Sequence, residues 1–96
     1  MAIALASVKT ALGISANVYD AEITALIASA EADLRLSGIT TYDAIDPLII
    51  TAVTCYCQAN RGTDTDKRGK YMEMYKAQKH NLWLAAEYTE AMYDTL

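Results

Sequence analysis

The sequence predicts an all-α protein, a small domain of about four helices with a long C-terminal helix. Alanine, a strong helix former, is abundant throughout the 96 residues. Apolar residues recur at spacings of three and four, and no run of four or more residues alternates convincingly as a strand would. Gly13, Gly38 and Pro47 stand between the helical segments, where helices usually end or begin.

The length and composition predict one domain, residues 1–96, that associates with other chains. A chain of 96 residues buries a modest fraction of its surface, so a lone monomer would be marginally stable. Yet 53% of the residues are hydrophobic, which is more than one small core needs. Oligomerisation is a common remedy for both problems. Residues 86–96 are predicted to form an extended or partner-docking tail.

The first two helices are bounded by recognisable end signals. A short helix is expected over residues 4–12, and Gly13 would stop it. A second helix is expected over residues 21–36, with Asp20 as its N-cap and Gly38 just past its end.

The second helix carries two opposed apolar stripes. The first consists of Ile23, Leu26, Ile27, Ala30 and Leu34. The second consists of Ala21, Ala25, Ala28, Ala32 and Leu36. Two such stripes suggest a helix that lies between two packing partners. The alternative is that alanine is present only because it favours helix formation.

The third helix is predicted to be the centre of the core. Asp46 is its expected N-cap, Pro47 its first residue and Asn60 its approximate end. Apolar side chains cover most of its circumference, as in a central core helix. Its narrow polar strip is formed by Thr51, Thr54 and Gln58.

A long final helix is expected over residues 66–93. It carries a heptad-like seam at alternating spacings of four and three: Tyr71, Tyr75, Gln78, Leu82, Ala85, Thr89 and Met92 or Tyr93. Trp83 and Leu84 fall outside this seam on a polar face. Large apolar groups in that position suggest a protein interface.

The stretch "NRGTDTDKRGKY", residues 60–71, is rich in charge and raises the possibility of a site. It begins like a calcium-binding EF-hand loop, but Arg68 and Tyr75 occupy two ligand positions, so calcium is not expected. Asp64 or Asp66 can cap the following helix. The predicted contact loop exposes four basic residues on an otherwise acidic subunit: Arg61, Lys67, Arg68 and Lys70. The alternatives are a plain connection and a segment that orders on an acidic partner.

No catalytic or metal-binding pattern emerges, and neither enzyme activity nor a cofactor is expected. His80 is the only histidine, and no carboxylate lies one turn away to orient it. Cys55 and Cys57 are expected to be small buried hydrophobes, and no zinc spacing exists. A net charge of −4 argues against tight nucleic-acid binding. No signal peptide or membrane span is expected, which predicts a soluble protein with no membrane partner.

The order of these features resembles the head–tail connector (adaptor) proteins of long-tailed bacteriophages. The resemblance is carried by "LASVKTALGIS", "YDAEITALIASAEADLRLSGI", "DPLIITAVTCYCQANRG" and "KRGKYMEMYKAQKHNLWLA". It covers roughly residues 4–84 and consists of packing motifs. The final "AAEYTEAMYDTL" matches no pattern of the family.

The resemblance implies a structural virion protein at the capsid–tail junction, assembled from subunits in the host cytoplasm. It implies a homo-oligomeric ring of about twelve copies beneath the portal protein. Such a ring would dock tail or stopper proteins, extend the DNA channel without sequence-specific binding and help to retain packaged DNA. The predicted subunit or portal interface comprises Ala21, Ala25, Ala28, Ala32, Leu36, Trp83 and Leu84.

A small helical DNA-binding or regulatory domain is the alternative function. It rests on the basic residues that open the final helix: Lys67, Arg68, Lys70, Lys76 and Lys79. A basic recognition helix is what such a domain would use to enter the major groove.

Overall fold

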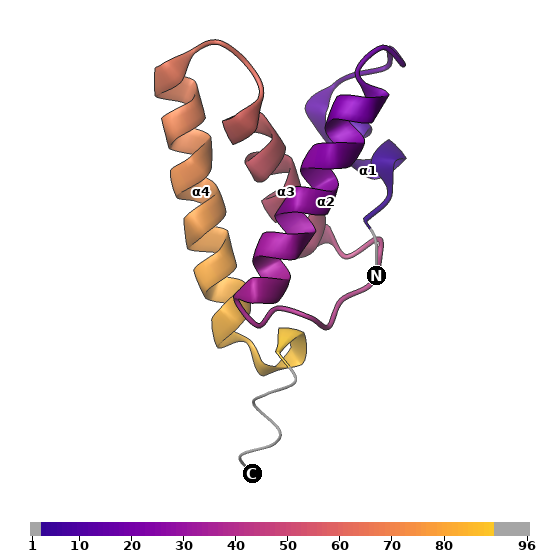
Figure 1. Ribbon diagram of the computed structural model, residues 1–96. Coiled ribbons are helices and arrows are strands. Elements are labelled where there is room, and N and C mark those ends of the chain that lie inside the picture. Colours follow the sequence, from indigo (N-terminus) through magenta and orange to yellow (C-terminus); the bar gives the residue numbers. More distant parts are fainter. Residues whose placement is uncertain (1–2, 90–96) are drawn as a thin grey trace.

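The computed structural model describes residues 3–89 and confirms the all-α prediction. The helices are α1 (Leu5–Leu12), α2 (Asp20–Leu36), α3 (Pro47–Asn60) and α4 (Thr65–Leu84). A short 3₁₀ turn, η1 (Ala86–Tyr88), follows α4 (Figure 1). Residues 3–89 contain no strand.

Helix α3 lies at the centre of the bundle, as its apolar circumference predicts. It packs against α1, α2 and α4 (Figure 1). Its fully buried side chains include Ile49, Ala52, Val53 and Cys57. Thr54 of the predicted polar strip is also buried, at 8% exposure, because neighbouring helices cover most of the surface of α3.

Local signals set several helix ends as expected. Gly13 ends α1 in the left-handed conformation, with φ of 73°, which glycine adopts at little cost. Asp46 caps α3 by accepting the backbone N–H groups of Leu48 and Ile49. Asp64 caps α4 by accepting the N–H of Lys67 at 3.1 Å.

The prediction that Asp20 caps α2 is wrong. Tyr19 holds the N-cap position, and Asp20 is the first helical residue. The Asp20 carboxylate instead pairs with the Lys9 ammonium of α1 at 2.8 Å. The helix begins one residue earlier than predicted, and the acid ties its first turn to α1.

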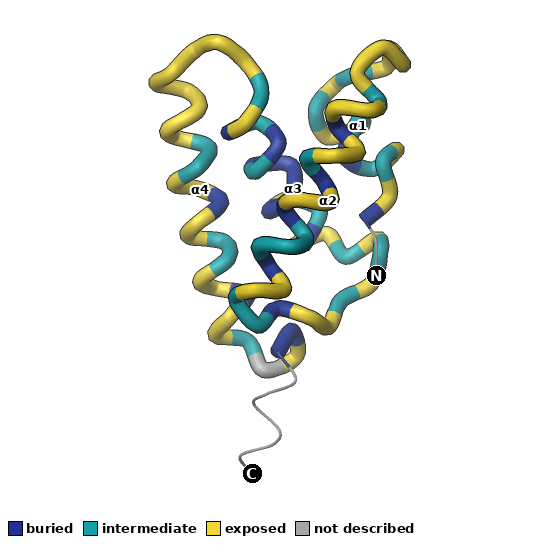
Figure 2. The backbone as a smooth tube through the Cα atoms, in the orientation of Figure 1, coloured by how far each residue is buried: buried dark blue, intermediate teal, exposed yellow. Residues whose placement is uncertain are grey.

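The two stripes of α2 separate cleanly between core and surface. In the inner stripe, Ile23, Ile27, Ala30 and Leu34 are buried and Leu26 is half-buried (Figure 2). The outer stripe has almost no cover, since only Ala32 of its members is half-buried and the others are exposed. The buried residues of α2 therefore all belong to the inner stripe.

Helix α4 ends at Leu84, so the predicted extent to Tyr93 is wrong. Ala85 adopts an extended conformation, and the chain turns through η1. The Tyr88 carbonyl then accepts the N–H groups of Thr40 and Thr41. These contacts with the α2–α3 connection replace further helical hydrogen bonds. Residues 90–93 of the predicted helix, and residues 90–96 of the predicted tail, lie outside the described residues.

The predicted seam of α4 faces the other helices up to the point where the helix ends. Tyr75 and Leu82 are buried, and Tyr71 and Gln78 are half-buried. The Tyr75 ring packs edge-on against the Tyr56 ring of α3, with 5.1 Å between the centroids. The spacing of four and three thus identifies the inward face of α4 correctly.

Candidate interaction surfaces

One end of the bundle collects exposed apolar side chains. Leu36 ends α2 with 89% of its surface exposed, and Trp83 and Leu84 end α4 with 50% and 57% exposed. Leu48 in the first turn of α3 is 58% exposed. We call this set the apolar end: Leu36, Leu48, Trp83 and Leu84. Large exposed apolar groups gathered in one region mark interaction sites.

Trp83 is partly supported by its own chain. Its ring stacks on the exposed His80 ring, with 6.2 Å between centroids and 26° between planes. The indole ring of Trp83 also lies beside Gly38, at the turn after α2. A Cβ atom added to that glycine would be 3.9 Å from Cδ1 and Nε1 of the ring. The predicted exposure of Trp83 and Leu84 is confirmed, and their role as an interface stays a prediction.

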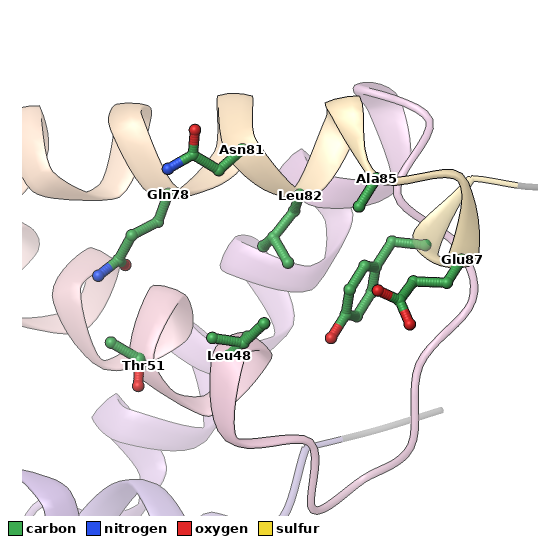
Figure 3. A pocket seen from close by; sticks show the side chains of 8 residues that line it. Leu48, Thr51, Gln78, Asn81, Leu82, Ala85 and Glu87 are labelled. Carbon is green, nitrogen blue, oxygen red and sulfur yellow. The ribbon is translucent and has the colours of Figure 1, made fainter.

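A groove of about 170 Å³ opens between the start of α3 and the end of α4 (Figure 3). Its apolar wall is made by Leu48, Leu82, Ala85 and Tyr88. Its polar rim is made by Thr51, Gln78, Asn81 and Glu87. No local pattern in the sequence indicates this groove, because its walls come from segments far apart in the chain. The one available signal was Leu48, an apolar residue in the first turn of a helix.

A hydrogen bond between α3 and η1 fixes one side of the groove. The Tyr88 hydroxyl donates to Asp46 Oδ2 at 2.9 Å, while Asp46 Oδ1 caps α3. Burial raises the pKa of Tyr88 to about 12, and the adjacent Asp46 carboxylate adds to this effect. The neutral, hydrogen-bonded tyrosine holds η1 against the beginning of α3.

The charged stretch at the other end is mostly helical. Only Arg61 of its four basic residues precedes α4, because α4 begins at Thr65, one residue before the predicted start, and includes Lys67, Arg68 and Lys70. These three are exposed, as predicted. Lys67 and Arg68, but not Lys70, line a hollow of about 640 Å³ together with Tyr19, Glu22 and Tyr71.

The prediction that Arg61 is exposed is wrong. Its side chain is 19% exposed, and its Nε donates to Glu22 Oε1 at 2.9 Å. Its guanidinium also lies 5.1 Å from the centroid of the Tyr19 ring. Arg68, although exposed, donates its Nε–H to the Ala59 carbonyl at 2.9 Å. Two of the four predicted contact residues therefore bind within their own chain.

An acid of α2 joins that helix to α4. Asp33 accepts a short hydrogen bond from the Tyr75 hydroxyl and a salt bridge from Lys79 at 3.0 Å. Burial opposes ionisation of Asp33, but the bonds from Tyr75 and Lys79 outweigh it and lower the pKa of Asp33. Burial, together with the Asp33 carboxylate, raises the pKa of Tyr75 well above its usual value. The cluster links two helices and lies outside the groove.

Residues 3–89 contain neither an activated cysteine nor a cluster of metal ligands. The two cysteines are free and buried, as predicted, and burial raises the pKa of Cys57 to about 11. A neutral thiol of this kind is a poor nucleophile. No group of three or more His, Cys, Asp or Glu side chains in the described part could hold a metal ion. Within that part, no helix combines the length and apolar character that a membrane crossing requires.

The fold and its exposed apolar end define a small helical protein whose free surface suits contacts with other proteins. Residues 4–89 match the model of the phage connector protein family, so the chain belongs to that family. It is a family of structural proteins associated with the phage portal and tail. No curated protein matches the chain, and no solved structure matches it.

Proposed function

We propose that this connector forms a ring between the portal and the tail, and that the ring extends the DNA channel. The observation that carries the proposal is the apolar end, where Leu36, Leu48, Trp83 and Leu84 remain exposed in the single chain. Covering such a surface removes apolar area from water and stabilises the assembly. Repeated side-by-side contacts between copies would cover it and close into a ring.

Contacts with portal and tail would use surfaces beyond those that hold the ring together. The exposed Lys67 and Lys70, near the start of α4, suit an acidic neighbour. The rest of the outer stripe of α2, Ala21, Ala25, Ala28 and Ala32, suits an apolar partner surface. Assembly would begin in the host cytoplasm and end at the capsid–tail junction.

The proposed channel role agrees with the charge of the subunit. The chain carries a net charge of −4, and Arg61 and Arg68 are engaged within the protomer. Non-specific DNA affinity comes mainly from basic side chains on phosphates. An acidic ring would let DNA pass without holding it along the channel wall, and packaged DNA would be retained with the help of docked tail or stopper proteins.

Light scattering of the protein, alone and mixed with portal protein, tests the ring. We expect a closed oligomer of defined mass under at least one of these conditions. A strict monomer at high concentration that also fails to assemble on portal protein would overturn the proposal. Electron microscopy of the assembled species then shows whether the copies form a ring.

Filter binding of duplex DNA over a range of salt concentrations separates the connector from a DNA-binding domain. The connector is expected to bind weakly and without sequence preference. Sequence-selective binding would favour the alternative, since base contacts and not phosphate contacts distinguish sequences. Two of the five basic residues on which that alternative rests are engaged within the chain, since Arg68 donates to the Ala59 carbonyl and Lys79 pairs with Asp33.

A further inference from the structure

The geometry points to a specific subunit contact: Leu36 of one copy fits the α3–α4 groove of the next copy. This inference rests on the proposed ring and names the surfaces that would hold it together. The occupant of the groove is therefore a second copy of this chain.

Leu36 has the position and exposure of an inserting side chain. It is the last residue of α2 and is 89% exposed, more than any other large apolar residue of the described chain. It belongs to the outer stripe, opposite the residues that pack on the core. Its side chain therefore projects away from its own bundle.

The groove has the size and lining to receive one such side chain. Its volume of about 170 Å³ exceeds the ~150 Å³ of an engineered apolar cavity that binds benzene. The wall offered by Leu48, Leu82 and Tyr88 is apolar. Polar groups surround it on the rim, an arrangement typical of the centre and edge of a protein interface.

The two surfaces lie at one end of the bundle and face different ways. The C-terminal ends of α2 and α4 lie at the same end of the bundle (Figure 1). The chain then passes from α2 through a connection to the first turn of α3. In the view into the groove, α2 lies behind α3 and α4 (Figure 3). A contact between two different surfaces repeats from copy to copy, and it closes into a ring if the rotation allows.

Charges beside the two surfaces are complementary. Arg35 precedes Leu36 and is exposed, and Glu87 on the groove rim is exposed. Neither side chain forms an ion pair with another described residue. The Arg35 guanidinium of an arriving copy would therefore pair with Glu87.

The first test replaces Leu36 with glutamine, a good helix former of similar size. Because Leu36 is exposed in the protomer, circular dichroism and thermal unfolding should match the wild type. We expect the concentration needed for half-maximal assembly to rise about tenfold to a hundredfold. Val18→Gln is the matched control, since Val18 is 79% exposed but lies before α2 at the other end. It should assemble like the wild type.

A charge exchange tests the orientation of the contact. Arg35→Glu and Glu87→Arg should each weaken assembly, because each places like charges at the contact. The double variant should recover most of the wild-type assembly, since it restores an opposite pair. Failure of the double variant to recover would overturn the Arg35–Glu87 pairing.

Disulfide trapping tests the contact between copies. A variant with both Leu36→Cys and Thr51→Cys should form covalent ladders longer than dimers under oxidation, since each copy both gives and receives. Each single variant should form no ladder. The native Cys55 and Cys57 are buried and should not interfere.

The outcomes separate this contact from the ring itself. If the wild type assembles and Leu36→Gln assembles equally well, the contact is wrong and the ring stands. If Tyr93→Gln, and not Leu36→Gln, prevents assembly, the groove receives the C-terminal segment and the inference is overturned. If the wild type assembles under no condition, alone or with portal protein, both the ring and the contact are overturned.

Discussion

The two ends of the bundle differ in how far their surface side chains are bound by other residues of the same chain. Where α3 turns into α4, Arg61 reaches back to Glu22 and Tyr19, and Arg68 reaches the end of α3. At the apolar end, Leu36 and Leu48 have large exposed surfaces within the single chain. At the connection end two basic groups are thus bound within the chain, whereas at the apolar end Leu36 and Leu48 have no such cover.

The charge of a residue in this chain therefore does not show whether its side chain is free for contacts with a partner. The charged stretch attracts attention in the sequence, yet two of its four basic groups serve the protomer. The sequence places Leu36 in the predicted interface as the last member of the outer stripe of α2. The structure adds that the buried residues of α2 all lie in the inner stripe, so Leu36 is exposed in the single chain.

The largest expected change in the free energy of unfolding comes from a buried residue at the apolar end, and its exposed neighbour provides the comparison. Ile49→Ala should reduce the free energy of unfolding by about 2–5 kcal/mol, because Ile49 is fully buried and its loss leaves a cavity. Its neighbour Leu48 is 58% exposed, and Leu48→Ala should cost less than about 1 kcal/mol. Urea unfolding of the monomeric state measures both. Equal losses would mean that Leu48 already belongs to the core.

Asp46 provides the second test, because the two ends also differ in their helix caps. Asp46→Ala should cost about 2–3 kcal/mol, since it removes the cap of α3 and the acceptor for the Tyr88 hydroxyl. Asp64→Ala should cost about 1 kcal/mol, since it removes one capping bond of α4. Chemical denaturation compares the two. A greater loss for Asp64 would contradict the view that Asp46 anchors η1 as well as α3.

Most of the fold could be predicted from the sequence because its determinants are local. Pro47 and Asp46 mark the start of α3, and Gly13 marks the end of α1, through backbone preferences that need no tertiary partner. The end of α4 could not be predicted in the same way. The residues after Leu84 include good helix formers, yet the chain leaves the helical path there. Tyr88 instead forms hydrogen bonds with Thr40, Thr41 and Asp46, which lie far away in the sequence.

The candidate site was harder to predict, because it consists of relations between distant segments. The outer stripe of α2 was visible as a pattern, and the structure confirms that it lacks cover. The groove needs the start of α3 beside the end of α4, and no local spacing encodes that arrangement. The charge of Arg61 is likewise visible in the sequence, whereas its pairing with Glu22 of α2 is not.

The third prediction concerns the pH dependence of the apolar end. Tyr88 has a pKa raised to about 12, whereas an unfolded tyrosine ionises near pH ~10. The unfolded chain therefore loses this proton first as pH rises. The contribution of the neutral Tyr88 hydroxyl to the stability of the fold is fully present below pH ~10, and it is lost progressively as the pH rises towards 12.

Tyr88→Phe isolates this contribution. Between pH 10 and pH ~12 the variant should lose less stability than the wild type, although it starts from a lower value at neutral pH. Tyr71→Phe is the control, because the Tyr71 hydroxyl forms no hydrogen bond with the described residues. Thermal unfolding across the pH series provides the comparison. Parallel curves for wild type and Tyr88→Phe would contradict the assignment.

The smallest expected effect lies at the connection end. Arg61→Ala removes the pair with Glu22, whose side chain is 49% exposed, and the contact with the Tyr19 ring. Exposed ion pairs contribute little, so the loss should be about 0.2–1 kcal/mol and should shrink in high salt. Assembly should remain at wild-type concentrations if the apolar end holds the copies together. An assembly defect in Arg61→Ala larger than that in Leu36→Gln would reverse the assignment, because the charged connection would then be the surface that joins the copies.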